Sequence, residues 1–271
     1  MADEQQYILG TDSTELERLG FQHRVWSQDA AALWSRANIQ QGMKVLDLGA
    51  GPGFATFDLA EIVGETGSVT AIDISKSYVE YGNNQSKNRG FKNVNFLERQ
   101  VHNLQLDYEE YDIIYCRWVL SWLEDVDSVI AKICRLLKPG GAFLVQEYAQ
   151  WGTFRIIPEI PAIRTVIEAC RESWRLMPSE IDIAPRLPEM FINGGLTIEH
   201  KGVLEKVSAP GQLVWQWPAT FLHIYAEKLI EMGLLTEIKS TEFKNTWPIL
   251  EANPSAMIVT PLMMEFIARK A

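Results

Sequence analysis

The chain has 271 residues, of which 47% are hydrophobic and 22% are charged, as in an ordinary globular protein. Its 35 acidic and 25 basic residues give a net charge of −10, which argues against a nucleic-acid partner because phosphate backbones favour basic surfaces. The three cysteines are scattered without metal-ligand spacing, which indicates reduced thiols in a cytoplasmic protein. The polar start and the lack of a long apolar run predict no signal peptide and no membrane partner.

The first forty residues are predicted to be mostly helical. Leu16, Leu19, His23 and Trp26 recur near helical spacing. A second helix is expected from about 28 to 37.

The most informative stretch follows. A short apolar run ends at Leu48. Three glycines, Gly49, Gly51 and Gly53, then occupy alternate positions, and residues 54–63 have helical periodicity. We interpret this as a strand, a tight turn and a helix, because glycine permits positive φ and lets backbone approach a ligand closely. The unpaired N–H groups at the helix start favour a polar or anionic ligand. The spacing differs from the dinucleotide fingerprint G-x-G-x-x-G, so a turn without a ligand is the alternative.

Two acidic residues at predicted strand ends favour a ligand. Asp47 precedes the first glycine by two residues, where its carboxylate would repel a pyrophosphate and suit an ammonium group. Asp73 ends the next apolar run, 26 residues later, which is about the position of an acid that binds ribose hydroxyls.

Strand and helix patterns alternate from residue 43 to residue 135. Alternation of this kind predicts a parallel sheet whose two faces are covered by helices, with ligands at the carboxyl ends of the strands. The expected strands cover 44–48, 68–73, 94–98 and 111–116, and the expected helices cover 54–64, 76–89 and 126–137.

The second half is less regular. The periodicity predicts a helix over 161–177, a short helix over 187–192 and a strand over 196–203. Residues 210–250 show helical patterns and many aromatic residues but no convincing strand, and the apolar segment from 256 suits a closing strand.

Two motifs resemble class I S-adenosylmethionine (SAM) dependent methyltransferases. Val45-Leu46-Asp47-Leu48-Gly49-Ala50-Gly51-Pro52-Gly53 resembles their cofactor motif, and Leu137-Lys138-Pro139-Gly140-Gly141 resembles the turn before their fifth strand. The resemblance implies an α/β fold with a Rossmann-like doubly wound sheet of seven strands, mostly parallel with an antiparallel last strand. It divides the chain into an N-terminal helical lid (1–40), a SAM-binding core (41–207), a helical cap insertion (208–255) and a closing strand (256–271).

The resemblance also implies the residues that bind SAM and its product S-adenosylhomocysteine (SAH). They are Asp47, Gly49, Ala50, Gly51, Gly53, Asp73, Ile74, Gln100, Val101, Arg117, Trp118, Tyr7 and Gln22. The family often has an acid and an alanine where this chain has Gln100 and Val101; the Gln100 carbonyl can accept the same hydrogen bond from the adenine. Arg117 is a candidate partner for a carboxylate of SAM or of the substrate, with an ordinary ion pair as the alternative.

Catalytic residues are harder to assign. Glu147 follows the fifth predicted strand (142–146), and His23 and His223 lie in segments expected to cover the site, so each is a candidate general base. An edge carboxylate and packed histidines are the alternatives. No metal-ligand motif is present, so no metal is expected.

The predicted function is transfer of a methyl group from SAM to a small organic acceptor. A methyltransferase acting on a protein or RNA group is the first alternative, and a non-catalytic scaffold that binds SAM or SAH is the second. A nicotinamide-dependent oxidoreductase is less favoured because of the glycine spacing. A homodimer is compatible with the sequence, but nothing in the chain requires one.

Overall fold

The glycine-containing stretch and its neighbours fold as alternating strands and helices. The computed structural model describes residues 13–104, 106–108 and 110–271. The alternating elements are β1 (Lys44–Leu48), α2 (Phe54–Val63), β2 (Ser68–Asp73), α3 (Lys76–Arg89), β3 (Val94–Glu98), β4 (Tyr111–Arg117) and α4 (Val126–Leu136). Each strand pairs in parallel with its neighbours among these four, as the sequence predicted.

Three later strands complete a seven-stranded sheet with the order β3-β2-β1-β4-β5-β10-β7. They are β5 (Leu137–Gln150), β7 (Leu196–Leu204) and β10 (Leu262–Lys270). The last strand, β10, is antiparallel to both β5 and β7, which confirms the expected fold class. The strand order reverses between β1 and β4, where ligands bind in such sheets.

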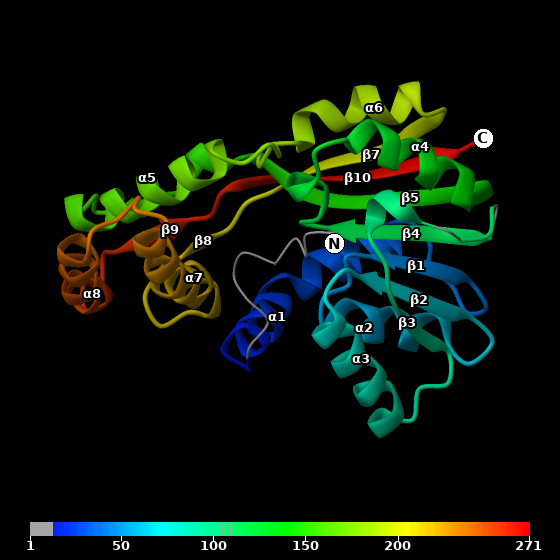
Figure 1. Ribbon diagram of the computed structural model, residues 1–271, viewed down its shortest axis with the longest axis horizontal. Helices are drawn as coiled ribbons and strands as arrows, with labels where there is room; N and C mark the ends of the chain where they lie inside the picture. The colour runs from blue at the N-terminus through cyan, green and yellow to red at the C-terminus, as the bar shows by residue number, and fades with distance from the viewer. Residues whose placement is uncertain (1–12, 105, 109) are drawn as a thin grey trace.

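Hydrophobic clusters hold helices on both faces of this sheet (Figure 1). On one face, α2 and the end of α1 (Ser13–Arg36) bury Leu33, Trp34 and Leu59 against β1 and β5. On the other face, α4 and α6 (Leu187–Asn193) bury Ile130 and Phe191. The carboxyl ends of the strands are therefore left free for ligands.

From Ser13 to Arg36 the chain forms one helix rather than the expected two. The second helix was expected to begin near residue 28, but the Ser27 hydroxyl donates back to the Arg24 carbonyl within one continuous helix (3.2 Å). Ala30, Leu33 and Trp34 continue the buried stripe that Trp26 begins. The helix therefore runs on from the edge of the sheet to its face.

The predicted turn at 137–141 lies inside β5. Leu137 already pairs with Tyr111, and the pairing shifts register before Ile113. Gly140 has φ of +75°, which accommodates this irregularity. The motif thus forms a bulge at the strand's start.

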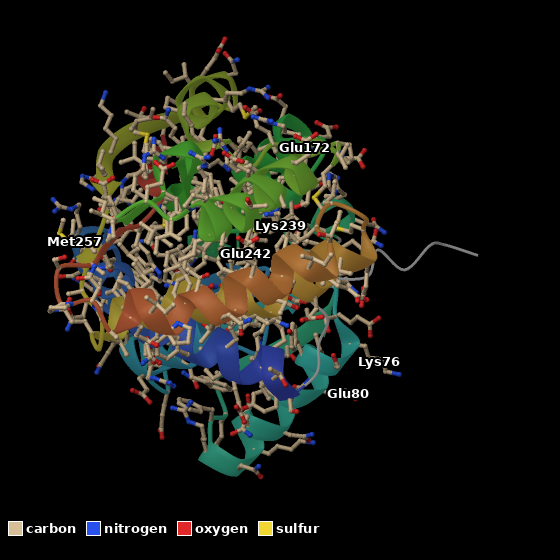
Figure 2. The ribbon with its side chains drawn as sticks, turned by 90° about the vertical axis from the view of Figure 1, so that its left-hand side faces the viewer. Lys76, Glu80, Glu172, Lys239, Glu242 and Met257 are labelled. Atoms are coloured by element: carbon tan, nitrogen blue, oxygen red, sulfur yellow. The ribbon has the colours of Figure 1, made fainter. Side chains whose placement is uncertain are left out.

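A helical unit extends from one end of the sheet. Helices α5 (Pro161–Arg175), α7 (Leu213–Glu231) and α8 (Glu237–Glu251) share a hydrophobic cluster. Figure 2 looks onto α8, whose Lys239 and Glu242 lie on its outer surface and form an ion pair of 2.8 Å. The proposed division into lid, core, cap and closing strand stays a prediction, but α5 packs with α7 and α8 although it precedes residue 208.

A small second sheet joins this unit. It has the order β6-β9-β8, with β6 (Arg155–Ile157), β8 (Val207–Ser208) and β9 (Met257–Val259). The expected closing strand from residue 256 therefore needs correction: residues 257–259 pair with β6 and β8, and the strand that closes the main sheet begins at Leu262. Short 3₁₀ turns occupy Val101–Asn103, Leu120–Trp122, Trp151–Thr153 and Ala184–Arg186.

Candidate active site

One cavity of about 450 Å³ runs from the glycine turn to the helical unit. It opens at the carboxyl ends of β1, β2 and β4, where the strand order reverses. Twelve of the residues singled out from the sequence line it. They are Gln22, His23, Asp47, Gly49, Ala50, Gly51, Asp73, Ile74, Gln100, Val101, Arg117 and Trp118. We call this end of the cavity, from the glycine turn to Arg117, the cofactor half.

The glycine turn is built around three positive φ angles, +62° at Gly49, +55° at Gly51 and +92° at Gly53. A Cβ at Gly49 would lie 2.4 Å from a Val119 methyl, and one at Gly53 would lie 2.3 Å from the Phe96 ring. A Cβ at Gly51, by contrast, would meet nothing within 4 Å. Packing thus requires two of the glycines, and Gly51 leaves open space beside the cavity.

Asp73 holds this turn in place. Its Oδ2 accepts a hydrogen bond from the Gly51 amide (2.8 Å), and its Oδ1 accepts one from the Ser75 amide (2.8 Å). Burial raises the pKa of the Asp73 carboxyl, and these backbone donors oppose the rise. Each oxygen keeps a further lone pair for a ligand hydroxyl.

Asp47 lies beneath the turn and is 3% exposed. The Thr56 hydroxyl donates to its Oδ2 at 2.6 Å. Burial raises the pKa of Asp47 to about 7, although Thr56 and the nearby Arg117 charge act in the opposite direction. A bound cation would favour its ionised form.

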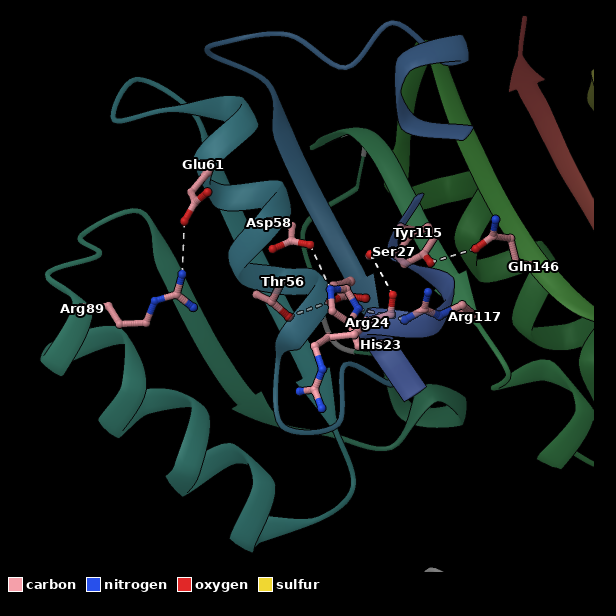
Figure 3. A network of polar contacts seen from close by, with 11 residues as sticks. His23, Arg24, Ser27, Thr56, Asp58, Glu61, Arg89, Tyr115, Arg117 and Gln146 are labelled. Carbon is pink, nitrogen blue, oxygen red and sulfur yellow. Dashed lines mark hydrogen bonds and ion pairs between the residues drawn. The ribbon is translucent and has the colours of Figure 1, made fainter. Parts of the chain in front are cut away.

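A second polar network connects α1 to β4 (Figure 3). Arg117 Nη2 lies 3.1 Å from His23 Nδ1, and His23 Nε2 lies 2.9 Å from Asp58 Oδ2. Because a guanidinium can only donate, Nδ1 accepts and the His23 proton resides on Nε2, which donates to Asp58. Both ring nitrogens of His23 are therefore engaged.

The other end of the cavity, which we call the aromatic half, is lined mainly by rings. These side chains come from the end of β5, from α5 and the residues that follow it, from α7, and from the 3₁₀ turns at Leu120–Trp122 and Trp151–Thr153 with the residue after the second turn. They include Trp122, Tyr148, Trp151, Phe154, Trp174, Met177, Trp217, Phe221 and Tyr225. The Tyr225 hydroxyl is engaged with Ser173 at 2.9 Å. This half suits a flat apolar molecule.

Trp118 forms the boundary between the two halves. Its φ of +54° is unusual for a residue with a side chain. Its ring stacks on Tyr148 (5.9 Å between centroids) and on Trp217 (6.0 Å). Gln22 joins α1 to the same wall, because its Oε1 accepts from Trp217 Nε1 (2.9 Å) and from Arg18 Nη1 (3.0 Å).

The structure does not bring every expected residue to the cavity. Gly53 belongs to the glycine turn but does not line the cavity, and Tyr7 lies outside the described residues. His223 needs correction, since its Nδ1 approaches the Ala219 carbonyl (2.7 Å) and its ring packs on Phe243 of α8.

Glu147 also needs correction. We expected it to face the ligand, but its side chain is fully buried and does not line the cavity. Its Oε1 instead accepts hydrogen bonds from the Val119 and Leu120 amides, each at 2.7 Å. Burial raises the pKa of Glu147 to about 7.

Sequence reasoning missed part of the aromatic half. Trp151, Phe154 and Trp174 lie outside the segment expected to form the cap. The helical periodicity of α5 predicted that Trp174 is buried but did not indicate what it faces. Within the described part of the chain, no cluster of His, Cys, Asp and Glu side chains suits a metal ion.

Comparisons with known proteins place this geometry in a family. The sequence model described as "Methyltransferase domain" matches residues 39–181, which is more than half of the chain. The chain belongs to this methyltransferase family. It is a class I SAM-dependent methyltransferase, and SAM is its methyl donor.

Individual relatives and solved structures similar to this chain are also methyltransferases. The ubiquinone/menaquinone biosynthesis C-methyltransferase UbiE of Shewanella piezotolerans is 31% identical over 189 residues, which are 64% of this chain and 72% of the relative. A SAM-dependent methyltransferase from Aquifex aeolicus has a TM-score of 0.55 at 21% identity, over 70% of this chain and 91% of that one. Geranyl diphosphate C-methyltransferase from Streptomyces coelicolor has a TM-score of 0.57 at 14% identity, over 92% and 82%. At these identities the two structures show the shared fold.

The residues of the methyltransferase's cofactor half fit SAM on their own chemistry. Gly51 leaves room for close approach, and Asp47 is a buried acid that suits the ammonium group. Arg117 Nη1 is buried without a hydrogen-bond partner among the described residues, as a carboxylate-binding group would be. Small-molecule methylation is the function that the relatives support, rather than modification of a protein or RNA.

Within the described residues, no helix has the length and apolar character that crossing a membrane requires.

Proposed function

We propose that the enzyme methylates a flat, apolar acceptor that lies in the aromatic half while SAM lies in the cofactor half. The observation that carries this proposal is the continuity of one cavity from the glycine turn to the rings of α5 and α7. A ring-lined pocket binds aromatic acceptors through stacking and apolar burial.

In the cofactor half, we assign each contact by its chemistry. Asp73 binds the ribose hydroxyls, Asp47 the ammonium group and Arg117 the carboxylate of SAM. Gln100 and Val101 form the adenine end, with the Gln100 carbonyl as hydrogen-bond acceptor. These roles rest on position in the cavity and on complementary charge.

For the reaction, we propose attack by a carbon of the acceptor, as in the C-methyltransferases named among the relatives. SAM supplies an electrophilic methyl group: the bond from sulfur to this methyl breaks, a bond from the acceptor carbon to the methyl forms, and the proton displaced from that carbon passes to water. The chain's contribution is to hold the acceptor near the methyl group, since alignment alone lowers such barriers by several kcal/mol. His23 has both ring nitrogens engaged, so we assign it to orienting Arg117 rather than to proton removal.

An acceptor screen tests this proposal. The purified enzyme would be incubated with SAM and with matched pairs of acceptors, apolar phenols and hydroquinones against hydrophilic amines and carboxylic acids. We expect SAH to form with the first group, with the new methyl group on a ring carbon by nuclear magnetic resonance. Turnover confined to hydrophilic amines or to peptides would contradict the proposal.

We further propose that the enzyme acts in the cytoplasm, where its three unpaired cysteines would stay reduced. The homodimer stays a prediction that light scattering of the purified protein would test.

A further inference from the structure

Glu147 is a buried carboxylate that the chemistry described above does not use. It lies on β5 between Gln146 and Tyr148, and its side chain is 0% exposed. Two consecutive amides, those of Val119 and Leu120, donate to its Oε1 at 2.7 Å. A buried acid that accepts two backbone hydrogen bonds constrains the segment that provides them.

That segment contacts both halves of the cavity. On one side, Val119 packs against the glycine turn so closely that a Cβ on Gly49 would lie 2.4 Å from its Cγ2. On the other side, the preceding residue Trp118 stacks on Tyr148 and Trp217 at the entrance to the aromatic half.

The backbone of Trp118 adds a second observation. A tryptophan at φ +54° occupies a sparsely populated conformation, which persists only where the surroundings determine it. The Trp118 amide donates to the Gln146 carbonyl (3.1 Å), and the next two amides donate to Glu147. Two consecutive residues of β5 therefore hold the backbone of this strained residue and of the two residues that follow it.

We propose that Glu147 is a positioning residue that fixes segment 118–120, and through it aligns the cofactor-binding glycine turn with the ring wall of the acceptor pocket. Its effect on the acceptor rests on the proposed function, whereas its effect on the glycine turn concerns SAM binding alone. Glu147 acts through Val119 and Trp118 and does not touch the reacting atoms.

The test compares three substitutions at this position. Glu147→Gln keeps a carbonyl oxygen that can accept both hydrogen bonds, Glu147→Leu removes the acceptor, and Glu147→Asp keeps the charge on a shorter side chain that cannot reach both amides. Glu265→Gln is the matched control, because Glu265 is a buried acid on the adjacent strand that bonds His200 and Gln146 and leaves segment 118–120 untouched.

Two readouts separate positioning from general structural support. Calorimetry measures the dissociation constant of SAM, and near-ultraviolet circular dichroism measures the contribution of the Trp118 stack, defined as the part of the wild-type spectrum that Trp118→Phe removes. For Glu147→Leu and Glu147→Asp we expect roughly tenfold weaker SAM binding and loss of the Trp118 contribution, because two buried amides lose their acceptor. Glu147→Gln should restore both to near wild-type values, and Glu265→Gln should change neither.

The proposal is overturned if a cooperatively melting Glu147→Asp or Glu147→Leu protein keeps both the Trp118 contribution and the wild-type affinity for SAM. It is also overturned if Glu265→Gln has the same effect as Glu147→Leu. If Glu147→Leu does not fold, the two measurements on Glu147→Asp alone test the proposal. Neither readout needs an acceptor, so a wild-type enzyme without turnover would count against the proposed function and leave this test intact.

Discussion

The two halves of the cavity are built in different ways. The cofactor half comes mainly from one contiguous stretch, from Asp47 to Val101, whose strands end side by side at the reversal of the sheet. The aromatic half draws on segments scattered from Trp122 to Pro261, which meet because α5 and α7 pack in one hydrophobic cluster.

The halves also differ in how they hold a ligand. The cofactor half positions buried charges through backbone amides and glycines, so its geometry tolerates little change. The aromatic half offers ring surface, which adapts to molecules of similar shape. This contrast suggests that the fold of the sheet determines which cofactor binds, whereas the packing of the helices determines which acceptor binds. The following substitutions test this contrast.

The largest effect is expected for Gly51→Ala. The new Cβ would meet no protein atom but would stand where SAM approaches the turn, so we expect SAM binding to weaken by roughly 100-fold. The matched control is Gly90→Ala, because Gly90 also has positive φ (+76°) and open space but caps α3 away from the cavity. Both should lose about 1 kcal/mol of stability from backbone strain in thermal melts. Equal SAM affinity in the two variants would contradict this reading.

Asp73→Ala should come next. It removes a ribose-binding carboxylate and the acceptor for the Gly51 and Ser75 amides, so SAM binding should weaken by roughly 1–3 kcal/mol. Asp125→Ala, which removes an acid that caps α4 in a similar way, should leave SAM affinity unchanged. Calorimetric titration measures both. Unchanged affinity in Asp73→Ala would mean that the ribose binds elsewhere.

The pH dependence of SAM binding should report Asp47. Its pKa is raised to about 7 in the free protein, so below this pH the acid is protonated and must lose its proton to pair with the ammonium group. Affinity should therefore rise by up to about tenfold per pH unit as pH increases towards 7, and then level off. Asp47→Asn should bind more weakly and show no such rise. A flat wild-type profile between about pH 5.5 and 7 would exclude this pairing.

The smallest effect is expected in the aromatic half. Phe221→Leu removes ring surface from a half-buried position, which should raise the KM for the acceptor about fivefold and leave the dissociation constant of SAM unchanged. Steady-state kinetics and calorimetry measure the two quantities. A parallel loss of SAM affinity would show that the halves are not independent.

The sequence predicted what local patterns encode. Asp47 and Asp73 follow apolar runs, and the alternation from 43 to 135 indicated the parallel strands, so local patterns predicted most of the cofactor half. The antiparallel last strand came from the family resemblance, and the structure confirms it. Periodicity could not show that Ser27 lies inside one continuous helix, because serine is common both in caps and in helices.

The features that the sequence did not predict depend on contacts between segments far apart in the chain. The position of Glu147 at the end of a predicted strand could not show that its side chain turns to the amides of Val119 and Leu120, which lie 28 and 27 residues earlier. His223 lies on a helix whose aromatic residues divide between the cavity and the contact with α8, and spacing alone does not say which face a given ring occupies. The small sheet of β6, β8 and β9 is likewise made of strands too short to leave a pattern.

The most direct test of the account is a calorimetric titration of the purified protein with SAM, SAH and NAD in parallel. A glycine turn with Asp47 beneath it and Asp73 beside it should bind SAM and SAH in a one-to-one ratio and should not bind NAD, whose pyrophosphate the buried Asp47 would repel. Binding of NAD more tightly than SAM, or no heat with SAM and SAH, would contradict the assignment of this half of the cavity.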